Sequence, residues 1–192
     1  LDDPLLEKIF ATAGELELPI TFHMSPEVGY SYGIVDDPGL PLLERALQKF
    51  SKTKFLGHSQ TFWIEMSGDA PTEKEARNHW GKGSVAPGGR VPELFAKYPN
   101  LYGDLSANSA GQAILRDPAF GLEFLETYAD RGLGDVYKRQ YADRLFFATD
   151  MVNAGMTFPL GAWLDEQTAK GALSTQAYQK ICHGNAQRVF GL

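Results

Sequence analysis

Four short apolar segments, separated by amphipathic stretches, constrain the fold of this chain more than any other feature. Each segment is rich in β-forming or small apolar residues and is bounded by loop-forming residues, as is typical of a buried strand. They are residues 18–24 (LPITFHM), 54–59 (KFLGHS), 100–106 (NLYGDLS) and 144–150 (RLFFATD).

The stretches around these segments have helical periodicity. Residues 3–14 start with Asp3 as a candidate N-cap and Pro4 in the first turn, and Gly14 ends the pattern. Similar patterns precede each later segment and close the chain, with short connections from helix to strand. Because helices alternate with apolar strands, the sequence predicts the α/β class, with a parallel sheet and right-handed crossovers.

Polar side chains lie at the ends of the predicted strands. His23, His58 and Asp150 end three of them, and the remaining strand carries Asp104 and Ser106 near its end. Long loops follow the strands on this side only, the longest being residues 60–89. Catalytic loops of parallel α/β folds lie at the carboxyl ends of the strands, so we expect the functional site there.

The residue types at these strand ends suit a metal. Neutral imidazole nitrogen and carboxylate oxygen are donors for zinc or a similar divalent cation. We expect His23, His58 and Asp150 to converge, although two histidines and one aspartate alone would supply few ligands for a metal. A hydrolytic metal also needs an open position for the water whose pKa it lowers.

Structural roles remain open for each of these residues. His23 can instead be a hydrogen-bonded core histidine, His58 can pack beneath the following loop, and Asp150 can cap the next segment. Asp104 can be a buried hydrogen-bonding carboxylate beneath the site. Side chains that could contact substrate, or simply pack their loops down, are Trp63, Tyr30, Tyr32 and Ser106.

Composition excludes several functional classes. The 192 residues carry a net charge of −6 with no basic cluster, so we expect no nucleic-acid partner. No apolar run approaches the roughly 20 residues that a membrane helix needs, so we expect no membrane partner. Cys182 is the single cysteine, which excludes an internal disulfide and favours a reducing compartment, with the cytoplasm as the default. The chain starts at Leu1 within a helical pattern, so we expect a fragment.

Five motifs carry a resemblance to a known family: LPITFHMSP, FLGHSQTFW, NLYGDLSAN, RLFFATD and GNAQRVFGL. Their order and spacing resemble the C-terminal half of the metal-dependent amidohydrolase superfamily. The most similar branch contains amino-carboxymuconate-semialdehyde decarboxylase and related non-oxidative decarboxylases. The resemblance implies that residues 1–192 form one domain, a partial (β/α)8 TIM barrel with about four C-terminal βα units and parallel strands.

The resemblance also implies roles for the strand-end residues. His23 matches the metal-binding histidine of the family's fifth strand, and His58 matches the sixth-strand histidine that contacts substrate or metal-bound water. Asp150 matches the eighth-strand aspartate, which is both a metal ligand and a proton-transfer group. The implied cofactor is a divalent metal ion, for which we expect zinc. The His-x-His pair of the family's first strand has no match in this sequence.

Three functions follow from this resemblance as alternatives. The first is a metal-dependent hydrolase acting on C–N or C–O bonds of a small substrate, cyclic substrates included, through metal-activated water. The second is a non-oxidative decarboxylase on the same site. A cation placed to bind the substrate carboxylate would favour this function, and the candidate is Arg90, after the loop that follows His58. The third is an inactive fragment that lacks the His-x-His ligands. A homo-oligomer is left open.

The tetrapeptide YADR occurs twice, at residues 128–131 and 141–144, on either side of GLGDVYKRQ. Removing the repeat offset would restore a spacing that suits a βα unit. We therefore interpret residues 132–140 as a foreign insertion or a sequencing artefact. If they are present in the folded chain, we expect an exposed loop on the face opposite the site.

Overall fold

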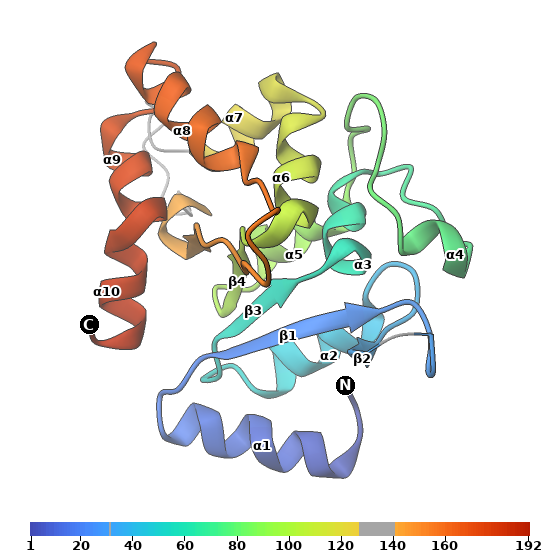
Figure 1. The fold of residues 1–192 in the computed structure, drawn as a ribbon. Helices are drawn as coiled ribbons and strands as arrows, with labels where there is room; N and C mark the ends of the chain where they lie inside the picture. Colours follow the sequence, from blue (N-terminus) through green and yellow to red (C-terminus); the bar gives the residue numbers. More distant parts are fainter. Residues whose placement is uncertain (31, 127–140) are drawn as a thin grey trace.

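A single parallel sheet organises the computed structural model, which describes residues 1–30, 32–126 and 141–192 (Figure 1). The order of the five strands is β2-β1-β3-β4-β5, and every neighbouring pair is parallel. The strands are β1 (Ile20–Ser25), β2 (Ile34–Val35), β3 (Phe55–His58), β4 (Leu101–Asp104) and β5 (Leu145–Phe146). The prediction of four parallel strands is thus confirmed, and the short β2 is an addition that the sequence pattern did not predict.

The strand predicted over residues 144–150 was too long, because β5 ends at Phe146. Its partner β4 ends at Asp104, and a helix begins at Ala107, so the residues after Phe146 have no strand beside them. Isolated hydrogen bonds still hold this segment, including one from the Ala107 N–H to the Thr149 carbonyl at 3.1 Å. Asp150 therefore lies beyond the strand instead of at its end.

Helices lie between the four strands that the sequence predicted, and the first turn of α1 follows the expected chemistry. The Asp3 side chain accepts a hydrogen bond from the Leu5 N–H, and Pro4 occupies the first helical position. The helical elements are α1 (Pro4–Glu15), α2 (Pro41–Lys49), α3 (Gln60–Trp63), η1 (Ile64–Met66), α4 (Lys74–Arg77), α5 (Arg90–Lys97), α6 (Ala107–Leu115), α7 (Pro118–Glu126), η2 (Tyr141–Arg144), α8 (Pro159–Ala169), α9 (Thr175–Gln179), η3 (Lys180–Gly184) and α10 (Asn185–Phe190).

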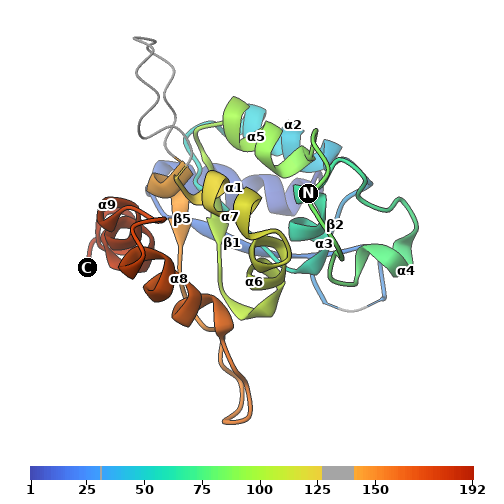
Figure 2. The same ribbon diagram turned by 90° about the horizontal axis from the view of Figure 1, so that it is seen from above.

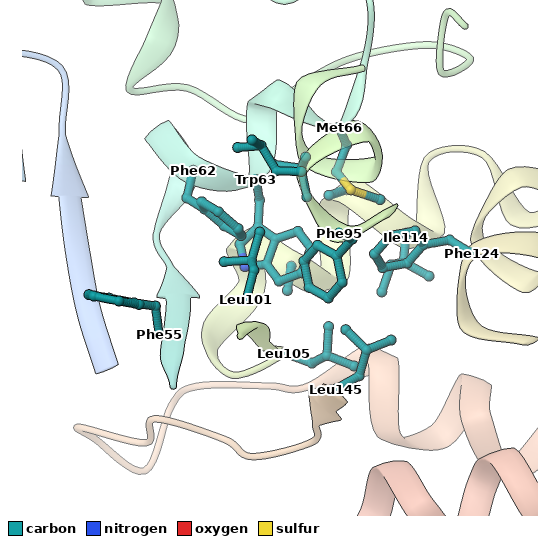
Figure 3. Close-up of a cluster of buried hydrophobic side chains, with 14 of the residues drawn as sticks. Phe55, Phe62, Trp63, Met66, Phe95, Leu101, Leu105, Ile114, Phe124 and Leu145 are labelled. Carbon is teal, nitrogen blue, oxygen red and sulfur yellow. The ribbon is translucent and has the colours of Figure 1, made fainter. Parts of the chain in front are cut away.

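The main hydrophobic core lies between one face of the sheet and the helices that cover it (Figure 3). Phe55, Leu101 and Leu145 extend from β3, β4 and β5 into this cluster. The backbone of β3 also approaches α3 closely, since a Cβ on Gly57 would lie 2.3 Å from the ring of Phe62. This close approach explains why a glycine interrupts an otherwise apolar strand.

The opposite face of the sheet carries a smaller apolar cluster. Leu56, Tyr102 and Phe146 alternate with the core residues along their strands and pack with Val189 of α10. His58 and Asp104 lie two residues after Leu56 and Tyr102, so they share this second face. In a closed barrel this face would be the interior.

The second copy of the YADR repeat forms η2, where Arg144 has a packing role that the sequence pattern did not reveal. Arg144 is 7% exposed, and its guanidinium donates hydrogen bonds to the carbonyl oxygens of Phe95, Tyr98 and Leu101. The first copy and residues 132–140 lie outside the described residues, and so does the expectation of an exposed loop there. Among the described helices, none has the length and apolar character needed to cross a membrane.

Candidate functional site

Two histidines meet where β1 and β3 end. His23 and His58 are paired residues in the parallel register of these strands. Their ring centroids are 5.4 Å apart, with an angle of 50° between the ring planes. The register thus brings together two imidazoles that are 35 residues apart in the sequence.

Ser59 fixes these two strand ends relative to each other. Its hydroxyl donates to the Met24 carbonyl at 2.8 Å and accepts from the Met24 N–H at 3.1 Å. The backbone of Ser59 has a φ of 97°, a region that favours glycine. Ala107 and Asp150 also have positive φ values, of 52° and 50°. Non-glycine residues in such conformations cluster at functional sites, where the surrounding structure holds them in place.

Asp104 contacts the side of His58 that faces away from Asp150. Its Oδ2 lies 3.1 Å from the Nδ1 of His58, and the Ser106 hydroxyl lies 3.2 Å from the same nitrogen. Burial alone would raise the pKa of Asp104, but hydrogen bonds from His58 and Ser106 outweigh it and place this pKa below the ordinary value. Because an ionised carboxylate can only accept hydrogen bonds, the Nδ1 of His58 carries a proton.

The other nitrogen of His58 faces Asp150. The distance between His58 Nε2 and Asp150 Oδ2 is 3.7 Å, and the Asp150 side chain is 53% exposed. In the neutral tautomer that Asp104 selects, Nε2 carries the lone pair. The site therefore presents a basic nitrogen and an accessible carboxylate next to each other.

His23 is held in a form that can donate a lone pair. Burial lowers the pKa of His23, the neighbouring His58 lowers it further, and the charge of Asp150 opposes both effects. The ring of Tyr32, which is 75% exposed, lies with its centroid 4.4 Å from that of His23. A neutral imidazole beside an accessible aromatic ring is suited to binding a cation or a substrate.

The structure brings some of the expected site residues together and separates others. His23, His58, Asp150 and Ser106 form one cluster, to which Asp104 belongs as the buried carboxylate beneath the site. Trp63 is 1% exposed in the hydrophobic core, where its indole N–H donates to the Asp104 carbonyl at 3.2 Å.

Two further candidates are held elsewhere. Tyr30 donates its hydroxyl to Glu75, at 2.8 Å, instead of facing the histidines. Arg90, the cation considered for a substrate carboxylate, pairs with Glu44 and with Glu93. Tyr32 therefore replaces Tyr30 as the tyrosine beside the cluster.

The donor types of the cluster suit a divalent cation, but the set is incomplete. His23 supplies an imidazole nitrogen and Asp150 supplies carboxylate oxygens. Within the described ranges, no group of three or more histidine, cysteine, aspartate or glutamate side chains is arranged to hold a metal ion. A complete coordination shell would need at least one donor from outside these residues.

Comparison with known proteins identifies the family of this chain. The family model described as amidohydrolase matches residues 1–192. The chain belongs to the amidohydrolase family. No functionally curated protein matches it.

Solved structures similar to this amidohydrolase-family chain include an amidohydrolase from Burkholderia multivorans, crystallised with HEPES and, in another crystal form, with zinc. Each superposes with a TM-score of 0.54 at 17% identity, and the match covers 100% of this chain and 59% or 58% of the other. A 2,6-dihydroxybenzoate decarboxylase from Rhizobium superposes with a TM-score of 0.51 at 15% identity, covering 99% of this chain and 56% of the other. This amidohydrolase-family chain thus spans somewhat more than half the length of these proteins, and its fold is a partial TIM barrel of the α/β class.

Proposed function

We propose that this chain carries part of the catalytic centre of a metal-dependent hydrolase that acts on C–N or C–O bonds of a small substrate. The observation that supports this proposal most strongly is the orientation of His58. Asp104 holds its Nδ1–H at 3.1 Å, which leaves the Nε2 lone pair directed towards the exposed Asp150 carboxylate. A basic nitrogen fixed in one tautomer beside a carboxylate is an arrangement for moving protons.

Each residue of the cluster then has a distinct task. His58 Nε2 takes a proton from, or returns one to, a substrate atom placed between it and Asp150. Asp104 keeps that imidazole in its tautomer and stabilises it when it is protonated. Asp150, being half-exposed, can accept a proton or a hydrogen bond from a bound molecule. Tyr32 offers an aromatic surface beside His23 for the body of the substrate.

His23 and Asp150 would hold a divalent metal, which would supply Lewis acidity and acidify a bound water. The zinc bound by the amidohydrolase from Burkholderia multivorans supports a metal of this kind. Because the described residues hold no group of three such ligands, we propose that this chain alone binds metal weakly and is inactive. The activity belongs to a protein in which further donors complete the shell.

Decarboxylation remains a second candidate, supported by the likeness in fold to the 2,6-dihydroxybenzoate decarboxylase. A decarboxylase needs a group that binds the substrate carboxylate. Arg90, considered for this role, is neutralised by Glu44 and Glu93. This pairing favours hydrolysis over decarboxylation.

Zinc titration of the 192-residue chain tests the metal part of the proposal. We expect a dissociation constant weaker than about 1 μM, since structural zinc sites with complete shells bind far more tightly. His23→Ala should weaken this binding further, whereas His79→Ala, in an exposed loop, should leave it unchanged. Tight binding of one zinc per chain would contradict an incomplete shell.

The reaction type is tested by product analysis on a longer version of the protein that binds metal tightly. Hydrolysis of amide or lactone substrates without release of carbon dioxide is expected, and His58→Gln should reduce it by about 100-fold or more. Release of carbon dioxide from an aromatic acid would favour the decarboxylase instead.

A further inference from the structure

A cavity of about 770 Å³ lies outside the histidine cluster, between η1, the residue after α6 and the loop that carries α4. This loop lies on the outer side of α3 in both views of the fold (Figures 1 and 2). None of His23, His58 and Asp150 lines the cavity. Its volume is in the range of small-molecule sites.

The wall of the cavity combines an apolar surface with positive charge. Ile64, Pro71 and the half-exposed indole of Trp80 supply apolar contacts. Lys82 and Arg116 supply two cationic groups. Among the described residues, neither cation forms an ion pair with a carboxylate.

The negative groups near this wall are already engaged. Asp69 lines the cavity, but its carboxylate accepts a hydrogen bond from the Ser67 hydroxyl. Asp117, next to Arg116 in the sequence, accepts hydrogen bonds from the backbone N–H groups of Val85 and Phe120, and its charge also interacts with that of Arg116. His79 also lines the cavity, but its Nε2 lies 3.4 Å from Oε1 of Glu75, so this side chain already has an acidic neighbour.

Arg116 is held in position with part of its hydrogen-bonding capacity unused. One nitrogen, Nη1, donates to the Lys82 carbonyl at 3.2 Å. Its Nε is buried and has no hydrogen-bond partner within the described part of the chain, and the same is true of the Ser109 hydroxyl. Both residues line a small recess that adjoins Trp80 and Gly81. Buried donors normally find a partner, and the recess, with a volume of about 10 Å³, has room there for about one water molecule.

Gly81 permits this placement of the guanidinium. A Cβ at residue 81 would lie 2.4 Å from Nη1 and 2.7 Å from Cζ of Arg116. The guanidinium therefore rests against the backbone of residue 81, where any other residue type would displace it. This contact offers a way to move the charge without removing it.

We propose that this cavity binds a small organic anion with a flat apolar body. Arg116 and Lys82 bind the anionic group by charge-assisted hydrogen bonds, and the apolar body packs against Trp80. The site is separate from the catalytic cluster, because none of His23, His58, Asp104 and Asp150 lines the cavity. A carboxylate or a phosphate ester would satisfy the same cations.

Calorimetric titration of the chain with benzoate tests this proposal. We expect saturable binding that weakens as sodium chloride is raised, and at least about tenfold weaker binding of the neutral analogue benzamide. Arg116→Gln and Lys82→Gln should each weaken benzoate binding by about 10-fold or more. Gly81→Ala should also weaken it, at unchanged net charge. Inorganic phosphate should bind more weakly than phenyl phosphate, since it cannot use Trp80.

Two control variants separate this site from others. Lys52→Gln removes an exposed cation elsewhere and should leave benzoate affinity unchanged, as should His58→Gln in the catalytic cluster. Three outcomes would overturn the proposal. They are the absence of saturable binding, loss of binding in His58→Gln, and unchanged affinity in Arg116→Gln, Lys82→Gln and Gly81→Ala. Because the Lys82 side chain forms no hydrogen bond or ion pair among the described residues, Lys82→Gln also guards against an effect of Arg116→Gln on folding.

Discussion

The Asp104 carboxylate favours a proton on Nδ1 of the His58 imidazole, because it accepts a hydrogen bond from that nitrogen. That single hydrogen bond keeps the proton on Nδ1 and so leaves a lone pair on Nε2, the nitrogen that faces Asp150. The site can therefore take up a proton at Nε2. At the scale of residues, the function therefore depends on a carboxylate that need not touch the substrate. Ser106 supports it by donating its backbone N–H to Asp104 at 2.9 Å.

Asp104→Asn should release this restraint. We expect a mixture of His58 tautomers, visible in imidazole ¹⁵N chemical shifts, in place of the single Nδ1–H form. The variant should also lose about 1–1.5 kcal/mol of unfolding free energy in urea, because a charge-assisted hydrogen bond is replaced by a neutral one. Asp2→Asn, at an exposed ion pair with Arg45, serves as the control and should change stability by less than about 0.5 kcal/mol. An unchanged tautomer in Asp104→Asn would contradict this role.

The pH dependence of this stability difference has a definite sign. Hydrogen bonds from His58 and Ser106 hold the pKa of Asp104 in the folded chain below its ordinary value of 3.8, so ionisation of Asp104 stabilises the fold at neutral pH. The contribution is complete above that value and is lost as the pH falls through the lower folded pKa. The deficit of Asp104→Asn relative to the original chain should therefore shrink below about pH 4. A deficit independent of pH would show that the charge is not responsible.

The sequence allowed some of these residues to be predicted and concealed others. His23, His58 and Asp150 could be predicted because each follows an apolar segment. Ser59 and Tyr32 could not be ranked in the same way, because their roles depend on the register of β1 and β3 and on the path of a loop. Trp63 was misleading because an aromatic residue after a strand is equally consistent with the core, where it lies.

At the scale of elements, Arg144 joins η2 to the end of α5 and to β4. Its guanidinium satisfies the carbonyl oxygens of Phe95, Tyr98 and Leu101 and lies 5.0 Å from the centroid of the Phe95 ring. A cation at a helix C-terminus also interacts favourably with the helix dipole. This contact holds β5 beside β4, and hence holds the segment that leads to Asp150.

Arg144→Met should lower the free energy of unfolding by about 2–5 kcal/mol, since buried carbonyl groups lose their donors. Arg144→Lys should recover only part of this loss, because an ammonium group lacks the planar fork that reaches three acceptors. Chemical denaturation measures both effects, and Arg45→Met, at an exposed site, provides the comparison with a change below about 0.5 kcal/mol. Equal stability of Arg144→Met and Arg45→Met would contradict this role for Arg144.

Elements were more predictable than their boundaries. The apolar segments and helix caps identified β1, β3 and β4 because burial and local capping are encoded within a few residues. The end of β5 depended on where its neighbour β4 stops, which lies outside the local sequence. The two-residue β2 pairs only with Met24 and Ser25 of β1, so it also depends on its neighbour and is too short to show a pattern in the sequence.

At the scale of the whole molecule, the sheet of the described residues is open, with β2 and β5 at its two ends. Because β2 pairs with β1 only at Met24 and Ser25, the rest of β1 has a free edge. Thr21 is exposed on this edge, and unpaired strand edges promote association with other chains.

Self-association through this edge should depend on protein concentration and should weaken in Thr21→Lys, because a charged side chain on an edge strand opposes strand pairing. Light scattering coupled to gel filtration measures the change in mass. Gln48→Lys on α2 adds the same charge at an exposed position away from the edge and should leave the association unchanged. If both variants dissociate equally, net charge is responsible and the edge is not the contact.

The pairing of His23 with His58 in the parallel register has a consequence for how activity is lost. A slip of one residue between β1 and β3 would turn every side chain of the moved strand to the other face, so no slightly displaced version of the pair exists. The Ser59 hydroxyl, bonded to both the N–H and the carbonyl of Met24, holds the strands at the point where such a slip would begin. Both imidazoles are therefore in place only when β1 and β3 pair in the correct register. Damage to this strand pair should abolish function completely and should not reduce it gradually.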